Sequence, residues 1–172
     1  MRSARLILAP AAALALLVSG CNSTTPASET TTQAATQAAI TFEEMWVKAT
    51  DEKMTAAFGF LHNTTDKDIH VTGVSSDVAG KSELHETVDK DGKMMMQEMK
   101  DGFVIKAGDK KELKPGGDHL MLMMLKEPIA PGQDVTVKIT TEGGEEFSFT
   151  APARTFAGAQ EEYGVHGEDD DH

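Results

Sequence analysis

Short stretches of alternating apolar and polar residues are the feature that most restricts how this chain can fold. The clearest pair lies near the C-terminus, where residues 135–139 and 147–149 alternate on either side of Gly143-Gly144. Alternation with period two is typical of a half-buried β-strand, and a Gly-Gly pair between two such runs indicates a hairpin. Comparable runs rich in Val, Ile, Thr and Phe recur between residues 40 and 156, separated by turn signals at intervals of about 8–12 residues. This pattern predicts an antiparallel all-β domain, either a sandwich or a barrel.

Nine strands are expected in this domain, and no segment shows the apolar spacing of an amphipathic helix. The domain, residues 40–156, has a usual size for a single hydrophobic core. The sequence contains no internal repeat. The expected strands are 44–49, 55–63, 70–75, 82–88, 93–98, 103–105, 119–125, 133–140 and 146–151.

The first 20 residues are predicted to be a lipoprotein signal peptide. Arg2 and Arg5 precede an apolar run, residues 6–18, that is short for a membrane span. Residues 18–21 (Val-Ser-Gly-Cys) then resemble a bacterial lipobox, with Cys21 as the lipid attachment site. The alternative is an ordinary signal peptide with an incidental cysteine. We expect an extracytoplasmic protein that an acyl chain anchors to the cell membrane.

Two polar segments flank the predicted domain. Residues 21–39 consist mainly of Ser, Thr, Ala, Gln and Pro, so we interpret them as a flexible tether. Residues 157–172 are acidic and end in Gly-Glu-Asp-Asp-Asp-His, which is typical of a disordered tail. The sequence leaves open whether the histidines of this tail bind Cu(II).

Cys21 is the only cysteine in the 172 residues, and this excludes several kinds of site. The domain has no partner for a disulfide, no thiolate nucleophile and no cysteine ligand for a blue-copper centre. Outside the cytosol a pair of thiols tends to oxidise to a disulfide. Methionine is therefore the better soft ligand for a site in that compartment.

Histidines and methionines are concentrated between residues 85 and 121. This stretch contains His85, the run Met94-Met95-Met96 and the sequence His119-Leu120-Met121. Imidazoles and thioethers are neutral donors, and the soft thioether suits Cu(I) better than Zn, Mg or Ca. We therefore interpret the stretch as a Cu(I) site on a β scaffold.

A hairpin is expected to bring part of this set together. Residues 89–92 (Asp-Lys-Asp-Gly) are a turn signal, and a four-residue loop there places His85 directly opposite Met96. Opposed Cβ atoms are about 4.5–5.5 Å apart, so both side chains could reach one metal. His119 and Met121 share a face of a later strand because side chains alternate along it. A one-residue slip of the hairpin would separate the set.

The other methionines in this stretch have two interpretations. Met94 faces the expected site one residue pair nearer the turn, so it is a candidate additional ligand or a guard. Met95, Met123 and Met124 are expected to pack in the core or at its rim, since methionine fills irregular gaps well.

Charge and motif content argue against two further classes of function, nucleic-acid binding and catalysis. The formal net charge of −12 would repel a phosphate backbone, so nucleic-acid binding is not expected. The sequence has no Gly-x-Ser-x-Gly motif, no phosphate-binding glycine loop and no recognisable pair of catalytic carboxylates. We expect a binding protein, not an enzyme, and a monomer.

The spacing of the candidate ligands resembles the signature of the PCuAC copper chaperones. Ten residues separate His85 from Met96, and twenty-two more precede His119-Leu120-Met121. Residues 113–119 (Leu-Lys-Pro-Gly-Gly-Asp-His) look like the turn that leads into the second half of that family's site, and residues 83–86 (Glu-Leu-His-Glu) are similar to another of its recurring stretches. The resemblance covers residues 40–152.

This resemblance implies a cupredoxin-like, Greek-key β-sandwich without blue-copper ligands. It also implies that His85, Met96, His119 and Met121 bind Cu(I) and pass it by ligand exchange to cuproenzymes such as cytochrome oxidase. The run of three methionines leaves the identity of the second ligand open. Two alternatives are a lipoprotein that sequesters copper for tolerance and a metal-independent β-sandwich interaction module.

Overall fold

The structure, a computed structural model, describes residues 38–158 and 162–163. The expected signal peptide with Cys21, most of the expected tether and most of the acidic tail lie outside these residues. Across the described part the chain forms strands, turns and loops without a helix, so this part has no helix that could cross a bilayer. The all-β prediction is confirmed.

Eleven strands make up the described fold. Their bounds are β1 (Ile40–Lys48), β2 (Met54–Asn63), β3 (Ile69–Ser76), β4 (Ala79–Lys90), β5 (Lys93–Glu98), β6 (Phe103–Ile105), β7 (Lys110–Leu113), β8 (His119–Leu125), β9 (Asp134–Thr141), β10 (Glu146–Arg154) and β11 (Glu162–Tyr163).

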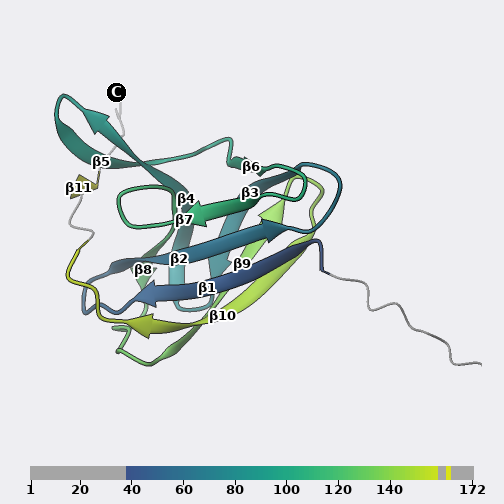
Figure 1. The fold of residues 1–172 in the computed structure, drawn as a ribbon. Coiled ribbons are helices and arrows are strands. Elements are labelled where there is room, and N and C mark those ends of the chain that lie inside the picture. The colour runs from purple at the N-terminus through teal and green to yellow at the C-terminus, as the bar shows by residue number, and fades with distance from the viewer. Residues whose placement is uncertain (1–37, 159–161, 164–172) are drawn as a thin grey trace, which may run out of the picture. The chain divides into compact units, whose positions relative to one another are not determined.

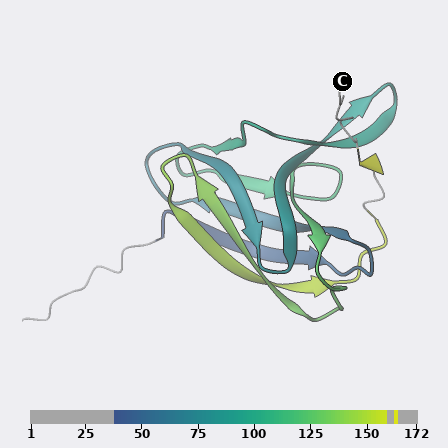
Figure 2. The same cartoon turned by 180° about the vertical axis from the view of Figure 1, so that it is seen from behind.

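The strands form two layers that continue into one another through the pairing of β1 with β10 (Figures 1 and 2). The hydrogen-bonded order is β11-β5-β4-β8-β2-β1-β10-β9-β3-β6, and β7 also pairs with β2. Among the described strands every pairing is antiparallel except β1 with β10 and β5 with β11, which are parallel. The site strands β5, β4, β8 and β2 are consecutive neighbours in the first layer.

The main hydrophobic core lies between the two layers. The first layer contributes one face of its strands, for example Leu84 and Leu120, and the second contributes residues such as Val137 and Ile139, all of them buried. Large aliphatic side chains dominate this core. Their burial is the principal favourable term in folding.

All nine expected strands are present, most of them longer than expected, and two strands were not anticipated. In β7 the residues are Lys-Lys-Glu-Leu, and only Leu113 is buried, so no apolar alternation marks it. In β11 two residues pair with Met95 and Met96 of β5, within a segment that the sequence predicts to be a disordered tail. Both strands are held by pairing with a longer neighbour, which composition does not reveal.

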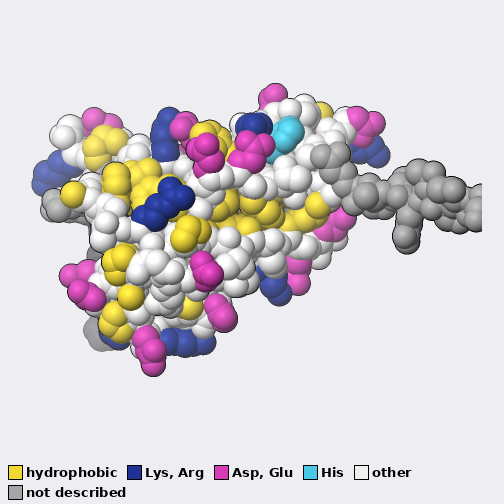
Figure 3. Space-filling model, turned by 60° about the horizontal axis from the view of Figure 1, so that its bottom comes forward, with side chains coloured by type: hydrophobic (Ala, Val, Ile, Leu, Met, Phe, Trp, Pro, Cys, Tyr) yellow, Lys and Arg dark blue, Asp and Glu magenta, His cyan; other side chains and the backbone are white. Residues whose placement is uncertain are grey.

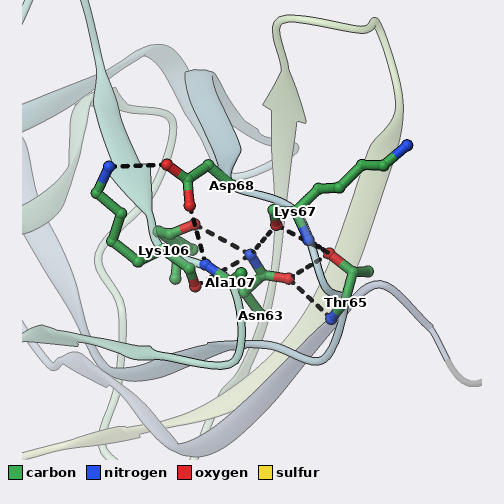
Figure 4. A network of polar contacts seen from close by, with 7 residues as sticks. Asn63, Thr65, Lys67, Asp68, Lys106 and Ala107 are labelled. Carbon is green, nitrogen blue, oxygen red and sulfur yellow. Dashed lines mark hydrogen bonds and ion pairs between the residues drawn. The ribbon is translucent and has the colours of Figure 1, made fainter.

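Asn63 fixes one end of the sandwich with its buried amide (Figure 4). Its Nδ2 lies 2.7 Å from the carbonyl oxygen of Lys67, 3.0 Å from that of Ile105 and 3.1 Å from that of Lys106. Its Oδ1 accepts hydrogen bonds from the backbone N and the hydroxyl of Thr65, at 2.9 and 2.8 Å. One side chain thus joins the end of β2 to the turn that follows it and to the end of β6.

We expect Asn63→Ala to destabilise the domain strongly. The change leaves the buried carbonyl of Ile105 without this donor, and unsatisfied buried polar groups cost about 1–3 kcal/mol each, so the free energy of unfolding should fall by about 2–4 kcal/mol. Urea unfolding monitored by circular dichroism measures this. Thr136→Ala, which removes an exposed hydroxyl contact with Thr150, should change stability by no more than about 0.5 kcal/mol. Equal losses of unfolding free energy in the two variants would contradict the stabilising role of Asn63.

Candidate metal centre

Two buried histidines lie side by side on neighbouring strands. His85 of β4 is the direct register partner of His119 of β8. Their ring centroids are 5.7 Å apart, and the residues are 1% and 2% exposed. The antiparallel pairing of β4 with β8 therefore brings together two side chains that are far apart in the sequence.

The histidines belong to the face of the first layer that points away from the main core. Along β8, Leu120 and Leu122 point into that core, whereas Met121 and Met123 belong to a second apolar cluster with Ala56, Phe58 and Trp46. Phe58 packs on Trp46 with 4.7 Å between centroids and lies 6.2 Å from the ring of His119. Because β8 is buried on both faces, its sequence is almost continuously apolar.

The predicted register of the β4–β5 hairpin is wrong by two residues. His85 pairs with Glu98, and Met96 pairs with Thr87 instead of His85. The loop consists of Asp91 and Gly92 alone, with φ of 57° and 80°. Two positive φ angles are typical of a type I′ turn, whose twist matches that of the flanking strands. β4 therefore continues two residues further toward the tip than a four-residue loop would allow, whereas β5 begins at Lys93 in both cases.

The shift of two residues leaves every side chain on its expected face. Met96 is half-buried and lies diagonally across from His85, where a long side chain still reaches its neighbour. Met94 lies on the same face but nearer the hairpin tip, and it is 45% exposed. Met121, 3% exposed, is two residues from His119 along β8 and faces Ala56 of β2.

A turn between β7 and β8 holds His119. Both strands pair with the same edge of β2, and residues 114–118 loop out between them. In this turn Pro115 precedes Gly116, whose φ is 75°, and the backbone N of Gly117 donates to the carbonyl of Lys114, as in a type II turn. The carbonyl of Gly117 lies 2.9 Å from Nδ1 of His119 and accepts a hydrogen bond from it. In the neutral ring the lone pair is therefore on Nε2.

Glu83 holds the other histidine. It is 7% exposed, and its Oε2 accepts a hydrogen bond from Nε2 of His85 at 2.7 Å, while its Oε1 forms an ion pair with Lys81. Burial acts to raise the pKa of Glu83, but the hydrogen bonds from Lys81 and His85 outweigh it, and the pKa lies below its ordinary value. Glu83 was not among the expected site residues. Its position two residues before His85, on the same face of a strand, was the available signal.

A pocket of about 350 Å³ opens beside the histidines. His119, Met121 and Met96 contribute to its wall, and His85 does not. Figure 3 shows hydrophobic side chains gathered at the end of the domain remote from the start of β1, with a basic side chain lying across them. The remaining lining residues are Lys48, Thr50, Glu52, Lys53, Met54, Thr55, Ala56, Phe58, Pro115 and Gly116.

The expectations for the other methionines are met in part. Met123 is buried in the second cluster, as expected. Met124 was expected to pack, but it is 66% exposed, because its φ of 53° turns the strand locally. Within residues 38–158 and 162–163, no three His, Cys, Asp or Glu side chains gather as a metal site. The donors that do gather here are imidazoles and thioethers, a soft and neutral set that favours Cu(I).

Solved structures with a similar fold include PCuAC domains. One is titled "Copper-bound PCuAC domain from PmoF2": the TM-score is 0.56 at 18% identity, over 69% of this chain and 94% of that one. Another is titled "Solution structure of CuI-DR1885 from Deinococcus Radiodurans": the TM-score is 0.53 at 23% identity, over 73% and 87% of the two chains. The predicted cupredoxin-like β-sandwich is thereby confirmed as the PCuAC fold.

Sequence relatives place the chain in a family. Residues 40–153 match the family model described as "Putative lipoprotein LpqE-like". The chain is also 40% identical over 163 residues to "Putative lipoprotein Lxx21020" of Leifsonia xyli subsp. xyli, over 94% of this chain and 98% of that one. The chain belongs to the LpqE-like family, which is of the PCuAC type, as the ligand spacing indicated.

Proposed function

We propose that this protein is an extracytoplasmic Cu(I) carrier that binds the ion through His85, Met96, His119 and Met121. The observation that carries the proposal is the pair of buried imidazoles 5.7 Å apart, with Met121 on the same face. Two neutral nitrogens and two thioethers suit Cu(I) and leave the loaded site with a charge of +1. The titles of two structural neighbours, a copper-bound PCuAC domain and a protein with CuI, support the same ion.

Transfer would proceed by ligand exchange through the pocket. Donors of an acceptor that enter there meet His119, Met121 and Met96, whereas His85 lies outside the pocket wall and is held from behind by Glu83. The acceptor would replace the pocket-side ligands first, and His85 would release the ion last. Thioethers bind Cu(I) less permanently than thiolates, which favours transfer over storage.

Met94 is a candidate additional ligand that would capture the incoming ion, whereas the four buried or half-buried ligands would retain it. Its exposed side chain lies on the ligand face of β5 beyond Met96. There it would meet an incoming ion before the buried ligands do. The site would then be completed by Met96, which is nearer to the histidines.

The histidine pair provides the main test of the proposed site. His85→Ala combined with His119→Ala should abolish Cu(I) retention, because the two thioethers that remain are weak donors on their own. Met121→Leu and Met96→Leu, which conserve volume, should each weaken Cu(I) binding by about tenfold or more. Anaerobic competition titration with a Cu(I) chelator measures the affinity, and X-ray absorption counts the nitrogen and sulfur neighbours.

Matched controls use residues of the same types outside the cluster. His70→Ala removes a partly exposed histidine beside Glu142, and Met124→Leu alters an exposed methionine. Both should leave the Cu(I) affinity unchanged, and circular dichroism should show a folded domain for every variant. Undiminished Cu(I) affinity in the folded double histidine variant would disprove the site assignment, and no binding by the wild type would favour the metal-independent module.

The protein would be anchored to the cell membrane through a lipid on Cys21. The support is the lipobox-like sequence at residues 18–21 and the lipoprotein names of the family and of its relative. We expect Cys21→Ala to move the expressed protein from the membrane fraction to the soluble extracytoplasmic fraction. Retention in the membrane fraction after this change would argue against the anchor.

The protein would deliver copper to a cuproenzyme such as cytochrome oxidase. The alternative function is sequestration of copper for tolerance. A deletion strain separates the two functions. Delivery predicts a loss of oxidase activity at low copper that added copper restores, whereas sequestration predicts copper sensitivity with normal oxidase activity. Complementation with the double histidine variant is the matched control, since it should restore neither phenotype.

A further inference from the structure

A buried carboxylate lies immediately behind the proposed copper site. Glu83 precedes His85 by two residues on β4, and the same strand carries Lys81 another two residues back, so the three side chains follow one face of the strand. Glu83 and His85 are buried, whereas the side chain of Lys81 is 58% exposed. Burying a carboxylate is costly unless charged or hydrogen-bonding partners compensate it. Lys81 and His85 are the partners that compensate Glu83.

The hydrogen bond to Glu83 decides which nitrogen of His85 can hold a metal. A carboxylate only accepts hydrogen bonds, so Nε2 of His85 carries the proton and the lone pair of the neutral ring is on Nδ1. At His119 the carbonyl of Gly117 selects the opposite tautomer, with the lone pair on Nε2. Nδ1 of His85 and Nε2 of His119 are both buried atoms of adjacent rings.

We propose that Glu83 is a positioning residue for Cu(I), which holds His85 so that Nδ1 is its metal-binding atom and adds a negative charge beside the site. This inference rests on the proposed function and deepens it. Outer carboxylates that orient a ligating histidine also raise its basicity, and removing such a partner typically weakens metal binding about 10–100-fold.

Charge supports the same assignment. Lys81 and Glu83 together are neutral, so the loaded site adds one positive charge to a neutral pair. Without the carboxylate, the negative charge that offsets the cation at Lys81 and lies beside the copper ion would be lost. Lys81 is largely exposed to solvent, which screens its own effect on the site.

The competing explanation is that Glu83 serves only as the partner of Lys81 in a surface-linked ion pair. Lys81→Met separates the two explanations, because it removes the ion pair and leaves the hydrogen bond between Glu83 and His85 intact. If the ion pair alone mattered, Lys81→Met and Glu83→Leu would have similar effects on copper binding.

The experiment measures Cu(I) affinity of the full domain by anaerobic chelator competition in three variants. We expect Glu83→Leu to lower the affinity about 10–100-fold and Glu83→Gln, which keeps an acceptor oxygen without the charge, about tenfold. Lys81→Met should stay within about twofold of the wild type, since exposed charges contribute little. Wild-type affinity in both Glu83 variants, or an equal loss in Lys81→Met, would overturn the proposal. If Glu83→Leu fails to fold, Glu83→Gln and Lys81→Met decide.

A second readout is independent of copper. In the metal-free protein, ¹⁵N NMR of the imidazole should show His85 protonated at Nε2 in the wild type and in Lys81→Met, and a mixture of tautomers in Glu83→Leu. Protonation at Nδ1 in the wild type would overturn the proposal even if the protein binds Cu(I). Failure of the wild type to bind Cu(I), with the Nε2-protonated tautomer present, would instead count against the proposed function and leave Glu83 as the determinant of the tautomer.

Discussion

The antiparallel ladder between β4 and β8 is the interaction on which the site depends. It pairs His85 with His119 directly, and because side chains alternate, it also puts Glu83 and Met121 on the same face. A ladder shifted by one residue would exchange this set for Leu84 and Leu120, which belong to the main core. The hydrophobic core therefore fixes the proposed metal site, because the burial of the leucines on one face determines where the histidines lie on the other.

The sequence predicts the fold class and the members of the cluster because both follow from period-two patterns and from the chemistry of donor atoms. The expected strand at residues 119–125 corresponds to β8, and the shared face of His119 and Met121 follows from alternation alone. The pairing of β4 with β8 could not be predicted from alternation, since no local sequence pattern indicates which distant strands are neighbours. Family resemblance provided that information indirectly, through the spacing of the ligands.

The errors have definite physical causes. The hairpin register depended on whether residues 89–92 or only Asp91 and Gly92 form the loop, and the twist preference of a type I′ turn decides for the shorter one. β7 was not predicted because it is a strand through its pairing with β2 and not through apolar residues of its own. Met124 was expected to pack like Met123, but a backbone irregularity directs it to solvent. Tertiary context outweighs composition in each case.

The hairpin that bears Met94 and Met96 has one more consequence. These two residues occupy alternate positions of one strand, so each is one pleat from the other on the same surface. A displacement of β5 along β4 by a single pleat away from the turn brings Met96 directly opposite His85 and puts Met94 opposite Thr87, in the place that Met96 has now. The same displacement toward the turn puts Glu98 opposite Thr87 instead. For a shift away from the turn the strand thus carries redundancy in its chemistry: an error of pairing that keeps the parity of the ladder still delivers a thioether to the side that faces the proposed copper site.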